Sequence, residues 1–484
     1  MKLVPSFLAV LLLVSGCAHY PRNARLTGSE PATGYRFRPP ASPRGINNGD
    51  TDPQSGQNIP RGEPTNSSDL LLMLAFSGGG TRAAALSYGV LEQLARTPLG
   101  VAGTQHRMLD EVDIISSVSG GSFTAAYYAL WGDRIFSDFE SRFLKKNVQT
   151  ALMLRVLSPW NQVRLASPKF GRSDLATEYY DHLLFQGATF AELSADRPFL
   201  CINATDTVSG ARFEFTQDEF DLIGSDVSQF PIARAVAASS AVPLLLTPVV
   251  LRNYSAEQTQ PEPEWIRSIL ADPASPPRVR YVASHARSYL EGHRRFIHLL
   301  DGGISDNLGL RAALDRIIAR EQSAPIPSAP WKLPCRVAII IVDAHTERDY
   351  GLDTKELSLG LKTLLGSVSG AVVRHYSFET IELVREVMAR LARERTGAGD
   401  SRSEAVVPYV IELHFNQLAD PSDRRFFNSV PTTFALPSKT VDRLRQLAAR
   451  ELADNAEFRR LVSDLGGQPD ATNLPARLSP ATTK

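Results

Sequence analysis

The sequence predicts a single α/β domain in which helices flank a mostly parallel central sheet. Short apolar segments of strand length alternate with longer segments of helical periodicity, and no internal repeat interrupts them. Three of the apolar segments run directly into glycine-rich turns. We expect strands at about 70–76, 113–117, 197–203, 297–301 and 336–343.

Length and charge limit the classes of function. At 484 residues, the chain has enough material for a large hydrophobic core. The formal net charge is zero, from 52 basic and 52 acidic residues, so electrostatics give no argument for a nucleic-acid partner. No group of His, Cys, Asp and Glu has the spacing of metal ligands, and we expect no metal site.

A serine in the stretch 113–130 lies between a predicted strand and a predicted helix. The apolar, β-branched strand ends just before Ser119, and Gly120 and Gly121 follow it. Because these glycines have no Cβ to obstruct a sharp turn, the Ser119 hydroxyl would stand at the helix N-terminus, where amides and the helix dipole favour an anion. Ser119 is therefore a candidate nucleophile, although Ser117 stands where the common G-x-S-x-G elbow has its first glycine.

The strand at 70–76 runs into a loop of three glycines. Gly78, Gly79 and Gly80 are followed by Arg82 and a helical segment. Successive N–H groups of such a loop form a cradle for an anion, either a phosphate or the oxyanion of an acyl intermediate. The spacing matches neither the phosphate-binding loop nor the dinucleotide-binding motif. Arg82 can hold the loop through hydrogen bonds to carbonyl groups or balance negative charge nearby.

The strand at 297–301 ends at a carboxylate. Asp301 is followed by Gly302 and Gly303. Active groups of open parallel sheets gather at the C-terminal ends of the strands, so we expect Asp301 to lie near Ser119. A carboxylate there can act as the base for Ser119 if its surroundings raise its pKa.

These three motifs, in this order, resemble those of the patatin-like phospholipase family. The resemblance spans about residues 68–465 and includes further matching segments at 203–206, 238–243 and 427–434. It implies the patatin-like α/β hydrolase architecture and identifies the chain as a bacterial member of that family.

The resemblance also implies hydrolysis of ester bonds in phospholipids or related lipids. Ser119 would attack the ester, Asp301 would accept its proton and return it to the leaving alcohol, and water would hydrolyse the acyl-enzyme. No metal or other cofactor is required. The resemblance places the oxyanion at the glycine loop, namely at the amides of Gly78, Gly79 and Gly80 with support from Arg82.

Two other interpretations stay open. A Ser-His-Asp esterase needs a histidine, and His345, His375 and His414 follow Asp301; His345 lies at a strand end and fits best. His298 fits poorly because, three residues before Asp301, it would point to the other face of the strand. A non-catalytic envelope lipoprotein could use the glycine loop to bind a lipid or an anion, but it would need no serine and carboxylate beside that loop.

Residues 1–16 resemble a lipoprotein signal peptide. Lys2 precedes an apolar run at 7–14 that is too short to span a bilayer, and two small residues precede Cys17. The resemblance implies cleavage before Cys17 and attachment of diacylglycerol to its sulfur, which would anchor the protein to a membrane. Ala18 after the cysteine favours, by analogy, the outer membrane of a Gram-negative cell envelope. A plain signal peptide with an incidental cysteine is the alternative.

Composition divides the rest of the chain. Residues 17–67 are rich in Pro, Gly, Asn and Ser, and we expect a disordered or extended tether that holds the domain away from the lipid. The hydrolase domain covers 68–465 and includes a Pro-rich, charged insert at 251–295 that can act as a lid or a partner surface. Residues 466–484 form a loose tail. The strongly helical stretch 357–395 is expected to pack on the domain.

Two features of the domain leave alternatives. Residues 235–251 carry almost no charge, but their prolines argue against a spanning helix, and residues 242–246 either line an acyl-chain pocket or pack in the core. Cys201 and Cys335 lie in strand-like segments, where we expect buried thiols rather than a disulfide. The expected partners are the lipid substrate and a membrane; a protein partner is not indicated.

Overall fold

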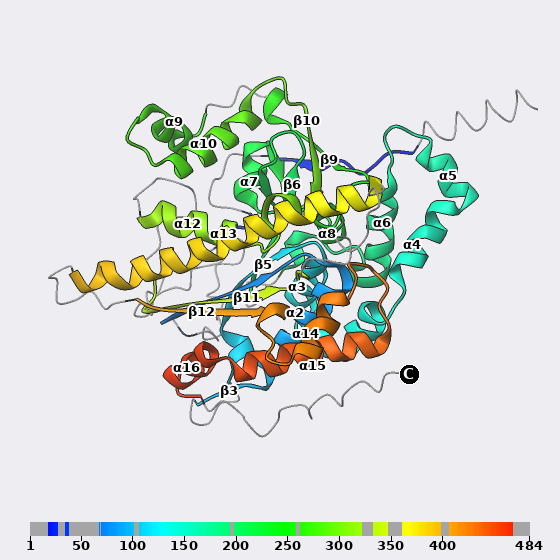
Figure 1. Cartoon of the computed structure of the whole chain (residues 1–484). Helices are drawn as coiled ribbons and strands as arrows, with labels where there is room; N and C mark the ends of the chain where they lie inside the picture. Colours follow the sequence, from blue (N-terminus) through cyan, green and yellow to red (C-terminus); the bar gives the residue numbers. More distant parts are fainter. Residues whose placement is uncertain are drawn as a thin grey trace, which may run out of the picture.

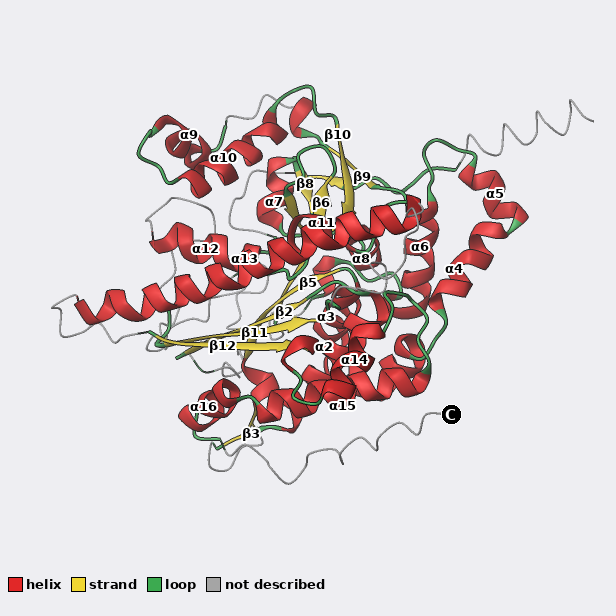
Figure 2. Cartoon of the chain, in the orientation of Figure 1, coloured by secondary structure: helices red, strands yellow, loops and turns green. Residues whose placement is uncertain are grey.

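A mixed sheet of eight strands forms the centre of the structure and carries helices on both faces (Figures 1 and 2). The computed structural model describes residues 18–27, 34–37, 67, 69–100, 106–193, 198–257, 262–321, 333–346, 361–397 and 406–467. The predicted signal peptide, the lipidation site Cys17 and most of the predicted tail lie outside these residues.

The central sheet is mostly parallel, as predicted. Its strands are β2 Leu70–Phe76, β5 Val112–Val118, β6 Phe199–Asp206, β7 Arg212–Glu214, β9 Val249–Arg252, β10 Phe296–Asp301, β11 Arg336–Asp343 and β12 Val407–His414. They lie in the order β12-β11-β2-β5-β6-β10-β9, with β7 also paired to β6. The first five strands of this order are parallel, whereas β7, β9 and β10 pair antiparallel with their neighbours.

The expectation that Asp301 follows a parallel strand is wrong, because β10 runs antiparallel to β6. Val118, the last residue of β5, lies opposite Asn203, and β6 continues beyond that level. β10 pairs with this extension, from Leu299 opposite Asp206 to Asp301 opposite Ala204. The C-terminal end of β10 therefore returns to the edge at which β5 ends, and Asp301 reaches the expected place from the opposite direction.

Helices cover the sheet on both sides. Their bounds are α2 Gly80–Arg96, α3 Gly120–Trp131, α4 Val148–Leu157, α5 Pro159–Leu165, α6 Arg172–Tyr180, α7 Gln217–Leu222, α8 Ile232–Ser239, α9 Glu264–Ala271, α10 Pro277–Leu290, α11 Gly303–Asp306, α12 Arg311–Glu321, α13 Leu361–Gly397, α14 Pro421–Ser429, α15 Ser438–Asp454 and α16 Ala456–Asp464. The structure also contains two π-helical segments, Ile135–Leu144 and Asp181–Phe185, and several short 3-10 helices. Two short antiparallel strand pairs lie outside the central sheet, β1 Ala24–Arg25 with β8 Ser225–Asp226 and β3 Pro98–Leu99 with β4 His106–Arg107.

Alternate residues of the central strands supply two separate apolar cores. In β2, Leu72 and Leu74 face the core that contains α2, α3, α8 and α15, whereas Leu71 and Met73 face the core that contains α12 and α13. Successive strand residues point to opposite faces, so a strand covered by helices on both sides must be apolar throughout. Every residue of β2 is buried.

The long helix α13 crosses one side of the sheet, opposite α15 (Figure 2). Val384, Val387, Met388 and Leu391 are buried in the second core, so the predicted packing of this helix is confirmed for that part. Among the described residues, no helix is long and apolar enough to cross a membrane.

Two stretches of the predicted tether are docked on the domain. Asn23 is only 4% exposed; its Nδ2 donates to Ser225 Oγ at 2.8 Å and to Arg252 O at 3.0 Å, and its Oδ1 accepts from Arg252 N at 2.7 Å. Beside it, β1 pairs antiparallel with β8. These bonds replace water at buried backbone groups, so the stretch 18–27 is a fixed part of the fold.

The second stretch, 34–37, is held by aromatic side chains. The Tyr35 ring stacks on Phe199 with 4.8 Å between ring centroids, and its hydroxyl accepts from Leu200 N at 2.7 Å. Phe37 is buried in the second core. The prediction of a loose tether is wrong for both stretches, because a few side chains with specific sites on the domain outweigh a composition typical of disorder.

Replacing Asn23 by Ala should therefore destabilise the whole domain. The change leaves Arg252 with an unpaired N–H and C=O, which costs about 1–3 kcal/mol of unfolding free energy. Urea unfolding of the full chain measures the loss, and Arg22→Ala, an exposed neighbour, is the control that should stay within about 0.5 kcal/mol of wild type. Equal stability of Asn23→Ala and wild type would show that this stretch is not docked in solution.

Candidate active site

The candidate nucleophile lies on a strained turn between β5 and α3. Ser119 has φ 50° and ψ −118°, a conformation that non-glycine residues rarely adopt and that costs about 1–3 kcal/mol. Its N–H donates to the Ser239 side chain at 2.8 Å, which satisfies the buried amide of the turn. Ser117 does not have a positive φ, so a glycine is not needed at that position, as expected from the sequence.

The Ser119 hydroxyl is bonded directly to the candidate base. Ser119 Oγ donates to Asp301 Oδ2 at 2.8 Å, and Gly303 N donates to Asp301 Oδ1 at 2.8 Å. The two side chains are 5% and 7% exposed. Burial raises the pKa of Asp301 to about 6, although the hydrogen bonds from Gly303 and Ser119 favour the ionised form. The carboxylate is thus ionised at neutral pH but basic enough to accept a proton.

One short segment at the C-terminal end of α8 holds both members of this pair, Ser119 and Asp301, which we call the dyad. The Ser239 side chain accepts from Ser119 N, the Ser239 carbonyl accepts from Gly302 N at 3.1 Å, and the Ala241 carbonyl accepts from Asp301 N at 3.0 Å. Ser239 Oγ in turn donates to Asn203 O at 2.7 Å. The segment 238–243 matched a family pattern, but the sequence alone assigned no role to Ser239; only the fold shows what it contacts.

The glycine loop offers fewer free amides than predicted. Gly78 N donates to Asn307 O at 3.0 Å, so the prediction that the Gly78 amide binds the oxyanion is wrong. Within the described part of the chain, the N–H groups of Gly79, Gly80 and Gly120 have no acceptor. As residues at helix starts, they have no intrahelical partner either. Gly120, which the sequence analysis did not place in the oxyanion site, directly follows the nucleophile.

The glycine loop and the turn at Ser119 are in contact, and this is possible only because the glycines have no side chains. A Cβ on Gly120 would lie 2.1 Å from Gly80 O, and a Cβ on Gly78 would lie 3.3 Å from Ser119 Cβ. Gly79 and Gly80 also have positive φ values of 143° and 60°. The free amides of both turns therefore lie beside the Ser119 side chain, where they can stabilise an oxyanion.

Arg82 holds the glycine loop from behind, as the sequence suggested. Its Nε donates to Ala344 O at 2.8 Å, one terminal nitrogen donates to Val430 O, and the other donates to Thr432 Oγ1 at 3.0 Å. Burial lowers the pKa of Arg82 to about 10, which leaves the guanidinium charged at neutral pH. Because all three of these hydrogen bonds go to protein groups, Arg82 positions the loop and the C-terminal segment rather than contacting substrate.

The histidine alternative gains no support from the geometry. His345 N donates to Asp343 Oδ1, and its buried Nε2 has no hydrogen-bond partner among the described residues. Burial lowers the pKa of His345 to about 4. His298 is exposed while Asp301 is buried, which places the two on opposite faces of β10, as predicted.

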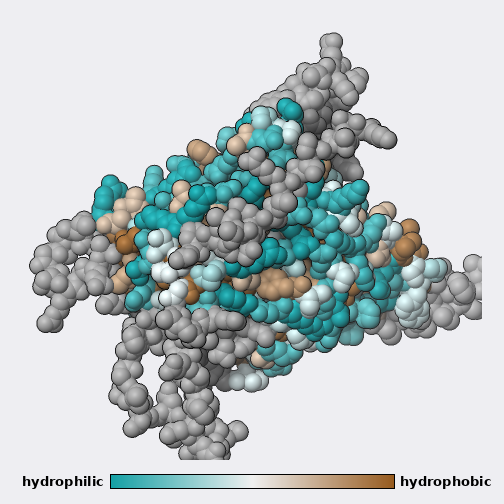
Figure 3. Space-filling view, turned by 90° about the horizontal axis from the view of Figure 1, so that it is seen from below, coloured by the Kyte–Doolittle hydropathy of each residue, from teal (hydrophilic) through white to brown (hydrophobic). Residues whose placement is uncertain are grey.

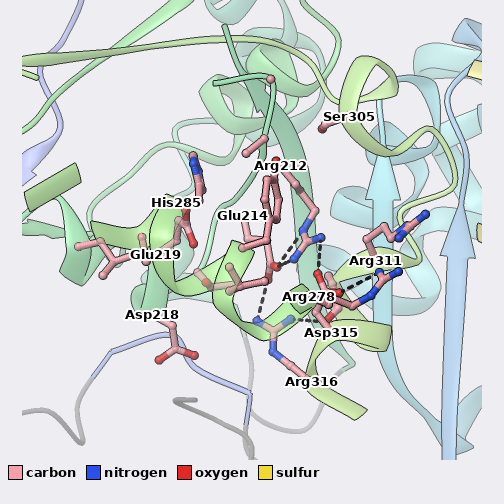
Figure 4. A pocket seen from close by; sticks show the side chains of 18 of the residues that line it. Arg212, Glu214, Asp218, Glu219, Arg278, His285, Ser305, Arg311, Asp315 and Arg316 are labelled. Carbon is pink, nitrogen blue, oxygen red and sulfur yellow. Dashed lines mark hydrogen bonds and ion pairs between the residues drawn. The ribbon is translucent and has the colours of Figure 1, made fainter. Parts of the chain in front are cut away.

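A cavity of about 590 Å³ lies away from the dyad, between β7, α7, α10 and α12 (Figure 4). Its wall carries ion pairs, such as Arg212 with Glu214 at 2.7 Å and with Asp315 at 3.1 Å. Helices α9 and α10 of the predicted insert line this cavity, whereas Ser119 and Asp301 do not. The described part of the insert therefore covers this cavity instead of the dyad.

The apolar segment 242–246 is not a core segment. Leu244 and Leu245 are 70% and 69% exposed, so core packing, one of the two alternatives for this segment, is wrong for them. Cys201 and Cys335 are free thiols, as expected, but only Cys201 is buried; the expectation of a buried thiol is wrong for Cys335, which is half-buried. The structure brings together no group of three or more His, Cys, Asp or Glu suited to a metal ion in the ranges that it describes.

Comparison with known proteins identifies a family. Residues 74–314 match the sequence model of patatin-like phospholipase. The chain belongs to the patatin-like phospholipase family. Ser119, Asp301 and the whole glycine loop lie within the matched patatin-like segment, which runs from β2 to α12. The strands β11 and β12 of the same sheet come from the chain beyond it.

Solved structures with some similarity include human GIVD cytosolic phospholipase A2, at 13% identity and a TM-score of 0.43 over 82% of this chain and 60% of that one. The same protein in complex with methyl gamma-linolenyl fluorophosphonate matches at 13% identity and a TM-score of 0.38, over 82% and 59%. This patatin-like chain thus spans about 60% of the length of these structures. No curated protein sequence matches the chain.

Replacing Ser239 by Ala should weaken both the site and the fold. The buried Ser119 N–H would lose its acceptor, which costs about 1–3 kcal/mol of unfolding free energy, and the turn would lose a constraint on its strained conformation. Urea unfolding should show this loss, and the rate at which a fluorophosphonate labels the protein should fall roughly tenfold or more.

Ser240→Ala is the matched control for this prediction. Ser240 is equally buried, but its hydroxyl donates to Val236 O within the same helix and does not contact the dyad. A labelling rate that falls equally in both variants would contradict the positioning role of Ser239.

Proposed function

We propose that the protein is a serine acyl hydrolase that cleaves ester bonds of phospholipids or related lipids, with Ser119 as nucleophile and Asp301 as base. The observation that carries the proposal is the 2.8 Å hydrogen bond between Ser119 Oγ and Asp301 Oδ2 on a strained strand-to-helix turn. Membership of the patatin-like phospholipase family supports the choice of a lipid ester as substrate.

In the acylation step, Ser119 Oγ attacks the ester carbonyl carbon while its proton passes to Asp301 Oδ2. The carbonyl oxygen becomes an oxyanion, which the N–H groups of Gly79, Gly80 and Gly120 stabilise. When the intermediate collapses, the carbon–oxygen bond to the alcohol breaks and Asp301 returns the proton to that alcohol. The products are a free alcohol, or lysolipid, and an acyl ester on Ser119.

In the deacylation step, a water molecule replaces the alcohol. Asp301 accepts a proton from this water as its oxygen attacks the acyl carbon, and the same amides stabilise the second oxyanion. Collapse releases the fatty acid and gives the proton back to Ser119 Oγ. A single carboxylate with a pKa of about 6 can serve both steps, because it alternates between base and acid.

The proposal extends to the place where the enzyme works. The sequence before Cys17 has the features of a lipoprotein signal, and we place the enzyme at the bacterial cell envelope, anchored through lipid on Cys17 to the outer membrane. Contacts of the docked stretch 18–27 support a short distance between the proposed lipid and the domain. Ser167 Oγ donates to Ala18 O at 2.6 Å, and Tyr20 N donates to Lys169 O at 2.9 Å. Ala18 is the residue that follows the proposed lipidation site.

Fluorophosphonate labelling of the full chain tests the dyad. We expect the reagent to react with Ser119, no labelling in Ser119→Ala, and a rate at least about 100-fold lower in Asp301→Asn, because the serine then lacks its base. Peptide mapping by mass spectrometry locates the modified residue. In His345→Ala, labelling should stay within a few-fold of wild type.

Three outcomes would contradict this proposal. Undiminished labelling of folded Asp301→Asn would remove the base, and loss of labelling in His345→Ala would favour a Ser-His-Asp esterase. Circular dichroism shows whether each variant is folded. No labelling of folded wild type would favour the non-catalytic alternative.

The pH profile gives an independent test of Asp301. Only the ionised carboxylate can accept the serine proton, so kcat/KM for a water-soluble ester should be constant at high pH and should fall as the pH drops through about 6. An aspartate with its ordinary pKa would place the inflection near 4. His345, with a pKa lowered to about 4, does not titrate near 6. An inflection that stays near 4 would refute the assignment of a raised pKa to the base.

A further inference from the structure

The helices α4 and α5 project from the body of the protein (Figure 1) and present apolar side chains to water. α4 buries only Val148, and no residue of α5 is buried. We define the apolar tip as Met153, Leu154, Leu157 and Trp160, which are 57%, 63%, 68% and 63% exposed. A projecting cluster of large apolar side chains marks a surface that binds a protein or a membrane.

The chain around the apolar tip is strongly basic, although the protein as a whole has no net charge. Residues 145–172 contain six Lys and Arg residues and no Asp or Glu. Two of the six form ion pairs, Lys145 with Glu140 and Arg164 with Glu178. In the described parts of the chain, no carboxylate pairs with the other four, which are Lys146, Arg155, Lys169 and Arg172.

A second exposed apolar pair belongs to the same region. Leu244 and Leu245 are exposed, and Leu244 has φ 71°, a conformation that is strained for a leucine. Thr247 fixes this loop to the start of α6, since it accepts from Ser173 N at 3.2 Å and from Ser173 Oγ. The fold thus holds two leucines in solvent at the cost of backbone strain, which is typical of functional surfaces.

The hydropathy of the surface agrees with this placement. Seen from below, the protein is mostly hydrophilic; one group of brown apolar side chains lies at the right edge of the view, and others lie at the left and near the centre (Figure 3). This edge corresponds to the side on which α4 and α5 project in Figure 1, because the two views differ by a rotation about the horizontal axis.

The region connects to both the dyad and the N-terminal stretch. The Ala241 carbonyl holds Asp301 N, and Leu244 follows Ala241 by three residues, which limits their Cα separation to about 11 Å. On the other side, Ser167, just after α5, holds Ala18. A lipid on Cys17 would therefore start one residue from a contact with this surface.

We propose that the apolar tip, Leu244 and Leu245, with their basic surround, form a membrane-binding surface that inserts between the lipids of an anionic bilayer. Apolar side chains enter the acyl-chain region while Lys and Arg contact the anionic headgroups. The role of this surface, the delivery of lipid to Ser119, rests on the proposed function. The binding itself requires no hydrolysis.

Fluorescence quenching by brominated lipids tests this insertion directly. The full chain carries Ser119→Ala, which prevents hydrolysis of the lipid, and is added to vesicles of dibrominated phosphatidylcholine with 30% phosphatidylglycerol. Trp160 is one of four tryptophans, so we expect quenching of roughly a quarter of the emission when the apolar tip inserts. Trp160→Phe should remove this quenching, whereas Trp265→Phe, in the wall of the cavity between α7, α10 and α12, should retain it.

Equal quenching in wild type and Trp160→Phe would overturn the proposal. A protein bound only through its N-terminal lipid, or an apolar tip that binds another protein, would leave Trp160 in water and give that result. The failure would not affect the dyad, because fluorophosphonate labelling is measured without vesicles.

The basic surround has a separate test. The triple variant Arg155→Gln, Lys169→Gln, Arg172→Gln should need at least about tenfold more anionic vesicles to reach half of the maximal quenching. A control triple variant of exposed cations elsewhere, Arg295→Gln, Arg425→Gln, Lys439→Gln, should bind as wild type. Equal weakening in both triple variants would show that net charge, and not this surface, attracts the membrane.

Discussion

The hydrogen bonds that the segment from Ser239 to Ala241 accepts are the constraint on which the site depends. They fix Ser119 on the turn after β5 and Asp301 at the end of β10, so that two residues 182 positions apart in sequence meet at 2.8 Å. Both groups are held in unfavourable states, because Ser119 has a strained backbone and Asp301 is a carboxylate removed from water. Buried bonds that are all satisfied can maintain such a pair, whereas a loose loop would relax it.

Much of the framework could be read from the sequence. Strands such as β2 and β11 are buried on both faces, so continuous apolar runs revealed them, and glycines before helices revealed the turns at which they end. Ser119, Asp301 and Arg82 were found in this way, and Arg82 binds carbonyls as expected. These turns could be recognised because each is marked by residue types within one short stretch of the chain.

The features that were missed depend on contacts between distant segments. Strand direction is not encoded within β10 itself, and the occupied amide of Gly78 depends on Asn307, more than two hundred residues away. Asn23 and Tyr35 lie in a chain whose composition is typical of disorder, and only their sites on the folded domain show that they are docked. The role of Ser239 could not be predicted for the same reason, because it depends on hydrogen bonds to Ser119 and Gly302 in distant segments.

The hydrogen bonds of Arg82 show that the fold cannot be cut at the end of the matched segment. Arg82 lies in α2 but donates to the carbonyls of Ala344 and Val430, and β2 pairs with β11. The part of the fold that carries Ser119 is therefore incomplete without the chain that follows residue 314. A gene fragment ending at the family boundary would expose the edge of β2 and release the glycine loop. The matched segment 74–314 is therefore not an independent folding unit, and fusions or chimaeras should keep the chain intact at least through Thr433, whose carbonyl accepts from the Thr81 amide.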